Sequence, residues 1–127
     1  MSFLKNMFGT SSDETTSKVG WRLLTDLGQL NEIIQESTEK PVVIFKHSTR
    51  CYISKSALKQ FENEFDLQEK VIPYFLDLIE HRAISNEIAV RFGVEHQSPQ
   101  LIVIKDGKAV YDASHENIDA AQLEQFI

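Results

Sequence analysis

Residues 41–54 read PVVIFKHSTRCYIS, and this stretch decides the fold. It starts with an unbroken apolar run through Phe45, rich in β-branched residues, which is typical of a strand buried on both faces. After Cys51, apolar residues recur every three or four positions, which predicts a helix; they are Ile53, Ala57, Leu58, Phe61 and Phe65. The stretch therefore predicts a strand that leads directly into a helix, with the chain's only cysteine at the turn.

A thiol at such a turn faces unpaired backbone N–H groups and the positive end of a helix dipole. This setting favours the reactive thiolate, and so do the basic residues nearby; they are Lys46, His47, Arg50 and Lys55. The alternative is that Cys51 is a buried small hydrophobe. Ser54 stands where a dithiol enzyme carries its second cysteine, so any disulfide of Cys51 must form with another molecule.

The remaining elements follow from periodicity and turn signals. Residues 21–24 are a short strand or an apolar lead-in. Helices are expected over 26–36, 83–92 (ended by Gly93) and 119–126, and strands over 42–46, 71–78, 101–104 and 109–111. Asp106-Gly107 predicts a tight two-residue hairpin turn between the last two strands. For capping, Thr25 and Asp26 suit the first helix equally, and Ser48 and Thr49 suit the helix after Cys51.

This order predicts an α/β domain with a mixed central sheet and helices on both faces. A helix follows each of the first two central strands, which indicates parallel right-handed crossovers. The terminal hairpin adds an antiparallel edge. Residues 1–18 are expected to be a flexible N-terminal segment, with apolar residues near its start that fit either a frayed end or a short docking turn. The domain is expected to span 19–127.

Composition excludes several classes of function. The chain has 127 residues, 42% of them hydrophobic, and a net charge of −6, which argues against general nucleic-acid or anionic-membrane binding. No apolar stretch approaches membrane-spanning length. A single cysteine fits a reducing compartment, and we expect a cytoplasmic protein. The four histidines show no metal-ligand spacing, so no metal site is expected.

Three stretches carry a resemblance to a known family: FKHSTRCYIS at 45–54, QSPQ at 97–100 and ASH at 113–115. Together with the element order they resemble the thioredoxin fold and, more closely, the monothiol bacilliredoxins of the YtxJ/BrxC type. Family members typically read Thr-Cys-Pro-Ile-Ser at the active turn. Here Arg50 replaces the threonine and Tyr52 the proline.

The resemblance implies a thiol-disulfide oxidoreductase that removes bacillithiol from S-bacillithiolated client proteins. Cys51 would be the nucleophile, and Ser54 either donates its hydroxyl to the thiolate or is an ordinary first-turn residue. Substrate would contact Arg50, Tyr52, Ser98 and Pro99, with the Ser98–Pro99 bond cis. No bound cofactor is implied; bacillithiol is the cosubstrate, and electrons come from NADPH through a separate reductase.

Arg50, Lys46 and Lys55 are either solvated charges or groups that attract the carboxylates of bacillithiol. Two rival functions stay open at this point. The first is a monothiol-glutaredoxin-like module that binds an iron–sulfur cluster through Cys51 and external thiols, although the Cys-Gly-Phe-Ser turn is absent. The second is a non-catalytic thioredoxin-fold interaction protein with an inert Cys51.

Overall fold

The computed structural model describes residues 19–127, so the predicted flexible segment 1–18 lies outside the described residues. The elements are, in order, β1 (Arg22–Leu23), α2 (Gln29–Glu36), β2 (Val42–His47), α3 (Tyr52–Glu64), β3 (Ile72–Asp77), α4 (Arg82–Phe92), β4 (Gln100–Lys105), β5 (Lys108–Ser114), and the 3₁₀ helices η1 (His115–Asn117) and η2 (Ala120–Phe126).

The strands form one mixed sheet in the order β1-β3-β2-β4-β5. β1 and β2 both pair parallel to β3, whereas β4 pairs antiparallel to β2 and β5 antiparallel to β4. The mixed α/β architecture is as predicted. One detail of the prediction is wrong: of the two predicted crossovers, β2–α3–β3 is parallel, but the β3–α4–β4 connection leads to an antiparallel strand.

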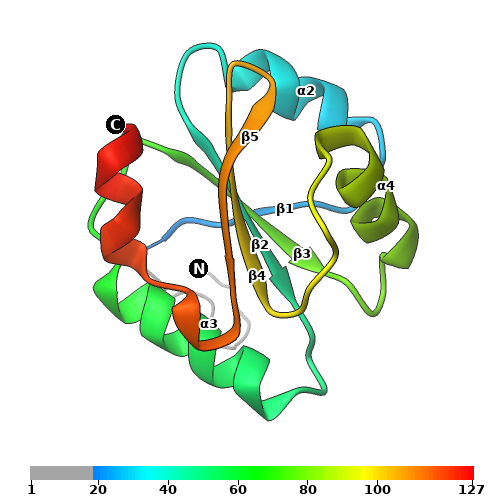
Figure 1. The fold of residues 1–127 in the computed structure, drawn as a ribbon, viewed down its shortest axis with the longest axis vertical. Helices are drawn as coiled ribbons and strands as arrows, with labels where there is room; N and C mark the ends of the chain where they lie inside the picture. The colour runs from blue at the N-terminus through cyan, green and yellow to red at the C-terminus, as the bar shows by residue number, and fades with distance from the viewer. Residues whose placement is uncertain (1–18) are drawn as a thin grey trace, which may run out of the picture.

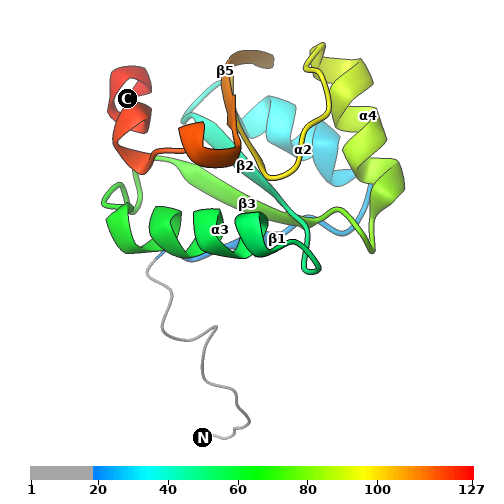
Figure 2. The ribbon, with the colours of Figure 1, turned by 60° about the horizontal axis from the view of Figure 1, so that its bottom comes forward.

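The helices cover both faces of the sheet (Figures 1 and 2). Val43 and Phe45 of β2 point into the core under α3 and η2, and Val42 and Ile44 into the core under α2 and α4. This alternation follows from the two-residue period of a strand. All six residues of β2 are buried, so its apolar part is enclosed on both sides as the sequence predicts.

The end of α4 and the hairpin turn have the form that the sequence predicts, and both contain residues with positive φ. Gly93 ends α4 in the left-handed conformation, with φ +67°. Asp106 and Gly107 have φ +53° and +77°, the mirror-image geometry that suits a two-residue hairpin. The turn is anchored to the end of α2, since Ser37 accepts from both turn N–H groups, at 2.9 Å and 2.8 Å.

Two helices differ from expectation. α2 begins at Gln29 after Gly28, so neither Thr25 nor Asp26 is its N-cap; the Asp26 carboxylate instead accepts from the Gly28 N–H. The last helix is a 3₁₀ helix, with Asp119 capping it through the Ala121 N–H. Its apolar residues recur every three positions at Ala120, Leu123 and Phe126, which matches the three-residue turn of a 3₁₀ helix.

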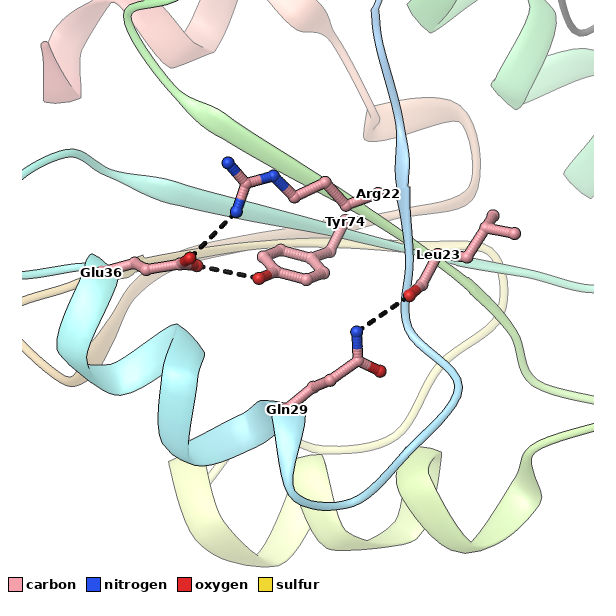
Figure 3. Close-up of polar contacts among 5 residues, drawn as sticks. All are labelled: Arg22, Leu23, Gln29, Glu36 and Tyr74. Atoms are coloured by element: carbon pink, nitrogen blue, oxygen red, sulfur yellow. Dashed lines mark hydrogen bonds and ion pairs between the residues drawn. The ribbon is translucent and has the colours of Figure 1, made fainter.

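The short edge strand β1 is held by side chains (Figure 3). The Arg22 guanidinium pairs with the Glu36 carboxylate at 2.9 Å, and the Tyr74 hydroxyl donates to the same carboxylate at 2.8 Å. The Gln29 amide donates to the Leu23 carbonyl at 3.1 Å. Burial, followed by the bond to Glu36, raises the pKa of Tyr74 above its usual value of about 10. These contacts tie β1 to α2 and β3, where backbone pairing covers only two residues.

Candidate functional site

Three segments meet at one edge of the sheet, the edge where β2 ends. The turn 48–51 leaves β2 there and enters α3. β4 starts at the same edge, because it runs antiparallel to β2 with Gln100 opposite Lys46. The carbonyl of Pro99, just before β4, accepts a 3.2 Å hydrogen bond from the N–H of His115, just after β5. The topology therefore brings the cysteine turn, the Ser98–Pro99 bend and the start of η1 together.

Cys51 is the N-cap residue of α3, with extended backbone at φ −106° and ψ 123°. Its N–H donates to the Ser48 carbonyl at 3.2 Å, and its own carbonyl accepts from Lys55. The expectation that Ser48 or Thr49 would cap the helix is wrong, since the 48–51 turn moves the cap to the cysteine. Cys51 thus stands at the position that serine or threonine often occupies at a helix start, although its side chain makes no capping hydrogen bond. The side chain is half-buried and unpaired with any other sulfur.

Ser54 lies in the first turn of α3 and is fully buried. Its Oγ accepts from the Ser48 N–H at 3.0 Å and lies 2.8 Å from Nδ1 of His47. The structure thus joins Ser54 to the end of β2 and to the turn. These hydrogen bonds connect His47 at the end of β2 and Ser48 in the turn to Ser54 in α3.

His47 is 5% exposed and is packed between aromatic rings. Its ring centroid lies 5.4 Å from that of Phe75 and 6.4 Å from that of Phe45. Burial is the largest influence and lowers the pKa of His47 below its usual value of about 6.5, against the opposing charges of Asp77 and Glu62. The imidazole is therefore neutral at pH 7.

Lys46 points to the opposite face of the sheet and is 0% exposed, so it does not line the surface near Cys51. Its ammonium nitrogen lies 3.3 Å from Nδ1 of His96 and 3.4 Å from the Ser85 carbonyl. The Ser85 hydroxyl lies 3.1 Å from the same His96 nitrogen. Burial lowers the pKa of Lys46 to about 8. This residue joins the sheet to the loop ahead of Pro99.

The other predicted contact residues are on the surface. Arg50 and Lys55 are exposed and flank Cys51 in sequence, and Tyr52 is 83% exposed. Beside Tyr52 a half-open groove of about 230 Å³ runs between the start of α3 and η1. Its lining is Tyr52, Ile53, Ser56, Ala57, Gln60, His115, Glu116 and Ile118. An exposed aromatic residue and two exposed cations thus lie within four residues of Cys51 in the sequence.

The Ser98–Pro99 peptide bond is cis, as the resemblance implies. Pro99 is buried. The Ser98 hydroxyl and the Gln100 side-chain oxygen are buried and have no hydrogen-bond partner among residues 19–127. Buried acceptors of this kind are normally satisfied by water or a ligand. Both atoms are enclosed by the protein around the bend ahead of β4.

The described part of the chain shows neither a cluster of metal-ligating residues nor a helix suited to span a membrane. Residues 19–127 contain no group of three or more His, Cys, Asp or Glu that could hold a metal ion. No helix among these residues is both long and apolar enough to cross a bilayer.

Two histidines near the site differ from what the sequence analysis expected: His47, grouped there with the basic residues around Cys51, is buried with a lowered pKa, and His115 had no role of its own. His47 shares a strand face with Phe45, so the two-residue period would have pointed it towards α3. His115 lines the groove with φ +57°, a conformation that nothing in the local sequence signals. The sequence analysis grouped Lys46 with the basic residues Arg50 and Lys55. Its position on a buried strand, which ends before Arg50, is the sequence feature that distinguishes Lys46 from those two residues.

The family model for monothiol bacilliredoxin BrxC matches residues 22–123. A solved structure described as a proposed oxidoreductase with a thioredoxin fold is 32% identical, with a TM-score of 0.70, and the match covers 81% of this chain and 89% of that one.

Two thioredoxins are similar at lower identity and show the fold alone. The thioredoxin of Malassezia sympodialis is 20% identical with a TM-score of 0.64, covering 87% of this chain and 90% of that one. Mitochondrial thioredoxin 3 of Saccharomyces cerevisiae is 20% identical with a TM-score of 0.62, covering 87% and 95%.

Proposed function

The chain belongs to the monothiol bacilliredoxin family and is a thioredoxin-fold redox protein, and from this we propose that it removes bacillithiol from S-bacillithiolated proteins. The observation that carries the proposal is the position of Cys51. The chain's only thiol is half-buried at the N-cap of α3, at the edge where the Pro99 bend and η1 meet.

In the first step the Cys51 thiolate attacks the bacillithiol sulfur of the mixed disulfide on the client. A disulfide forms between Cys51 and bacillithiol, the client–bacillithiol bond breaks, and the client cysteine leaves as a thiolate that takes up a proton from water. The client is reduced and Cys51 is oxidised by the same two electrons. Unpaired N–H groups at the start of α3 favour the anionic Cys51 sulfur, both when it attacks the client disulfide and when it leaves on regeneration.

In the second step the thiolate of another bacillithiol attacks the bacillithiol sulfur on Cys51. Bacillithiol disulfide leaves and the Cys51 thiolate is restored. An internal thiol cannot do this, because the chain has one cysteine and carries Ser54 at the second position of the dithiol motif. The regenerating thiol must therefore come from outside the chain, and membership of the bacilliredoxin family makes bacillithiol the proposed cosubstrate. The proposed cycle has no bound cofactor and takes place in the reducing cytoplasm.

Substrate recognition is proposed for the surface around the thiol. Arg50, with Lys55, would attract the carboxylates of bacillithiol, and the exposed Tyr52 ring would contact the mixed disulfide. Ser98 and Pro99 would shape the other side of the site. The exposure of Arg50 and Tyr52 supports their roles, and the cis Ser98–Pro99 bond at the same edge of the sheet supports the role of the bend.

Intact-mass analysis after incubation with bacillithiol disulfide tests the proposal. We expect one bacillithiol adduct on the wild-type protein, its removal by added bacillithiol, and no adduct on Cys51→Ser. A peptide with a bacillithiolated cysteine should then be reduced by the wild type only. Failure to form the adduct would refute the proposal, and a brown protein with charge-transfer absorbance would favour the iron–sulfur alternative instead.

A further inference from the structure

The hydroxyl of Ser54 links β2, the cysteine turn and α3. Its oxygen is 3.0 Å from the Ser48 nitrogen and 2.8 Å from Nδ1 of His47. The Ser48 carbonyl in turn accepts from the Cys51 N–H. A continuous series of hydrogen bonds therefore runs from the His47 ring to the backbone of the reactive residue.

The direction of the first bond is fixed by chemistry, and that of the second depends on the tautomer of His47. A backbone N–H only donates, so Ser48 occupies a lone pair of the Ser54 oxygen. The Ser54 side chain is fully buried, so its one hydroxyl proton needs an acceptor within the protein. The His47 nitrogen fills that need only if Nδ1 is unprotonated. The ring then carries its proton on Nε2.

We propose that His47 is a positioning residue for Cys51, acting by accepting the hydroxyl proton of Ser54 so that the Ser54 oxygen holds Ser48 and the turn that presents the sulfur. The inference rests on the proposed function only in taking Cys51 as the reacting group. It also gives Ser54 a different task from donation to the thiolate, because one hydroxyl proton cannot serve both acceptors.

The surroundings of His47 make this contact sensitive to acid. The charged groups that act on the ring are Asp77 from β3 and Glu62 and Lys55 from α3, and the rings of Phe45 and Phe75 pack beside it. Protonation would turn Nδ1 into a donor and remove the acceptor for Ser54. Because burial lowers the pKa of His47 below about 6.5, the contact holds at pH 7 and is lost only in more acid solution.

Two substitutions of His47 separate hydrogen bonding from packing. The side-chain oxygen of His47→Asn is as many bonds from the backbone as Nδ1 and accepts without titrating. His47→Phe keeps the ring among its aromatic neighbours but has no acceptor. If His47 matters only for packing, phenylalanine is the better replacement; if it matters as an acceptor, asparagine is.

The readout is the second-order rate of Cys51 alkylation by iodoacetamide between pH 5 and 8, which needs no bacillithiol. We expect His47→Asn to stay close to the wild type and to lose the acid-side inflection. His47→Phe and Ser54→Ala should each react about tenfold more slowly, the scale of a lost helix-terminus interaction. The double variant should be no slower than either single variant, because both act through one contact.

His81→Gln is the matched control, since the His81 side chain makes no capping bond at the start of α4; its rate should equal that of the wild type. Phenylalanine outperforming asparagine, or additive losses in the double variant, would overturn the proposal. Nitrogen NMR of the wild-type ring at pH 7 is a second test that needs no variant, and a proton on Nδ1 would also overturn it. If alkylation behaves as expected while no bacillithiol adduct forms, only the proposed function fails.

Discussion

The backbone N–H of Cys51 donates a 3.2 Å hydrogen bond to the carbonyl of Ser48, and Cys51 remains extended at φ −106° and ψ 123° while the next residue is already helical. An extended residue is the one that tolerates a following proline, because the proline ring disfavours helical backbone before it. Tyr52, the first residue of α3, therefore occupies a position at which proline fits.

Tyr52→Pro should fold and retain bacillithiol transfer. Its free energy of unfolding should be unchanged or up to about 1 kcal/mol higher, because proline restricts the unfolded chain. Urea denaturation and the single-turnover transfer rate measure both effects. Ser56→Pro is the control, since it lies at an exposed position in the second turn of the same helix and should cost about 3 kcal/mol. Unfolding of Tyr52→Pro would show that its N–H makes an essential bond.

The absence of a second cysteine from the sequence predicts a burst. With no free thiol present, the wild-type protein should release one equivalent of client from a bacillithiolated peptide and then stop. Added bacillithiol should convert the burst into steady turnover, because only an external thiol can attack the adduct on Cys51. Quenched-flow mass analysis follows both phases. Repeated turnover without external thiol would contradict the monothiol mechanism.

Arg50→Gln should slow regeneration by bacillithiol about two- to fivefold at low salt, the scale of an exposed charge interaction. Regeneration by neutral β-mercaptoethanol should not change. Raising the salt from about 0.02 M to about 0.5 M should reduce the difference, because screening shortens the reach of exposed charges. Lys59→Gln, an exposed lysine further along α3, is the matched control. Equal effects on both thiols would show that the Arg50 charge is not used for recognition.

Lys46 predicts a rise in stability with pH. Its pKa in the folded protein is about 8, below the usual 10.5, so between these values the unfolded chain binds more protons than the folded protein. The free energy of unfolding should therefore increase by about 2 kcal/mol between pH 7 and about 9.5. Urea titrations at the two pH values measure it.

Lys46→Met should lose this rise in stability and be more stable than the wild type at pH 7, because methionine has no charge to desolvate. Lys59→Met, at an exposed position, should keep the wild-type pH dependence. A wild-type stability that is flat from pH 7 to 9.5 would show that the Lys46 ammonium is solvated or paired.

The sequence predicts most of the fold because strong local signals agree with the tertiary packing. The apolar run of β2, the left-handed Gly93 and the Asp106-Gly107 turn all have the predicted form. The helix starts are less predictable. Ser48 and Thr49 have better capping side chains than Cys51, and the hydrogen bond from Cys51 to Ser48 overrides that preference.

At the candidate site, the sequence identifies the residues but not the hydrogen bonds between them. It singles out Cys51 and Ser54 from spacing alone. It does not show that the Ser54 hydroxyl meets His47, because that contact depends on how α3 packs over the end of β2. The sequence does place Lys46 on the predicted strand and Arg50 beyond it, but it does not show that Lys46 is fully buried against His96 and Ser85.

The opposite orientations of Lys46 and His47 limit how the end of β2 can evolve. Lys46 reaches the loop ahead of Pro99, while its neighbour His47 reaches α3. A substitution of one residue leaves the contact of the other in place. Inserting or deleting one residue in β2 would exchange their faces and break both connections at once. Alteration of this strand is therefore restricted to point changes, and the turn that follows it is held in length by the hydrogen bonds of Ser48 to Ser54 and Cys51.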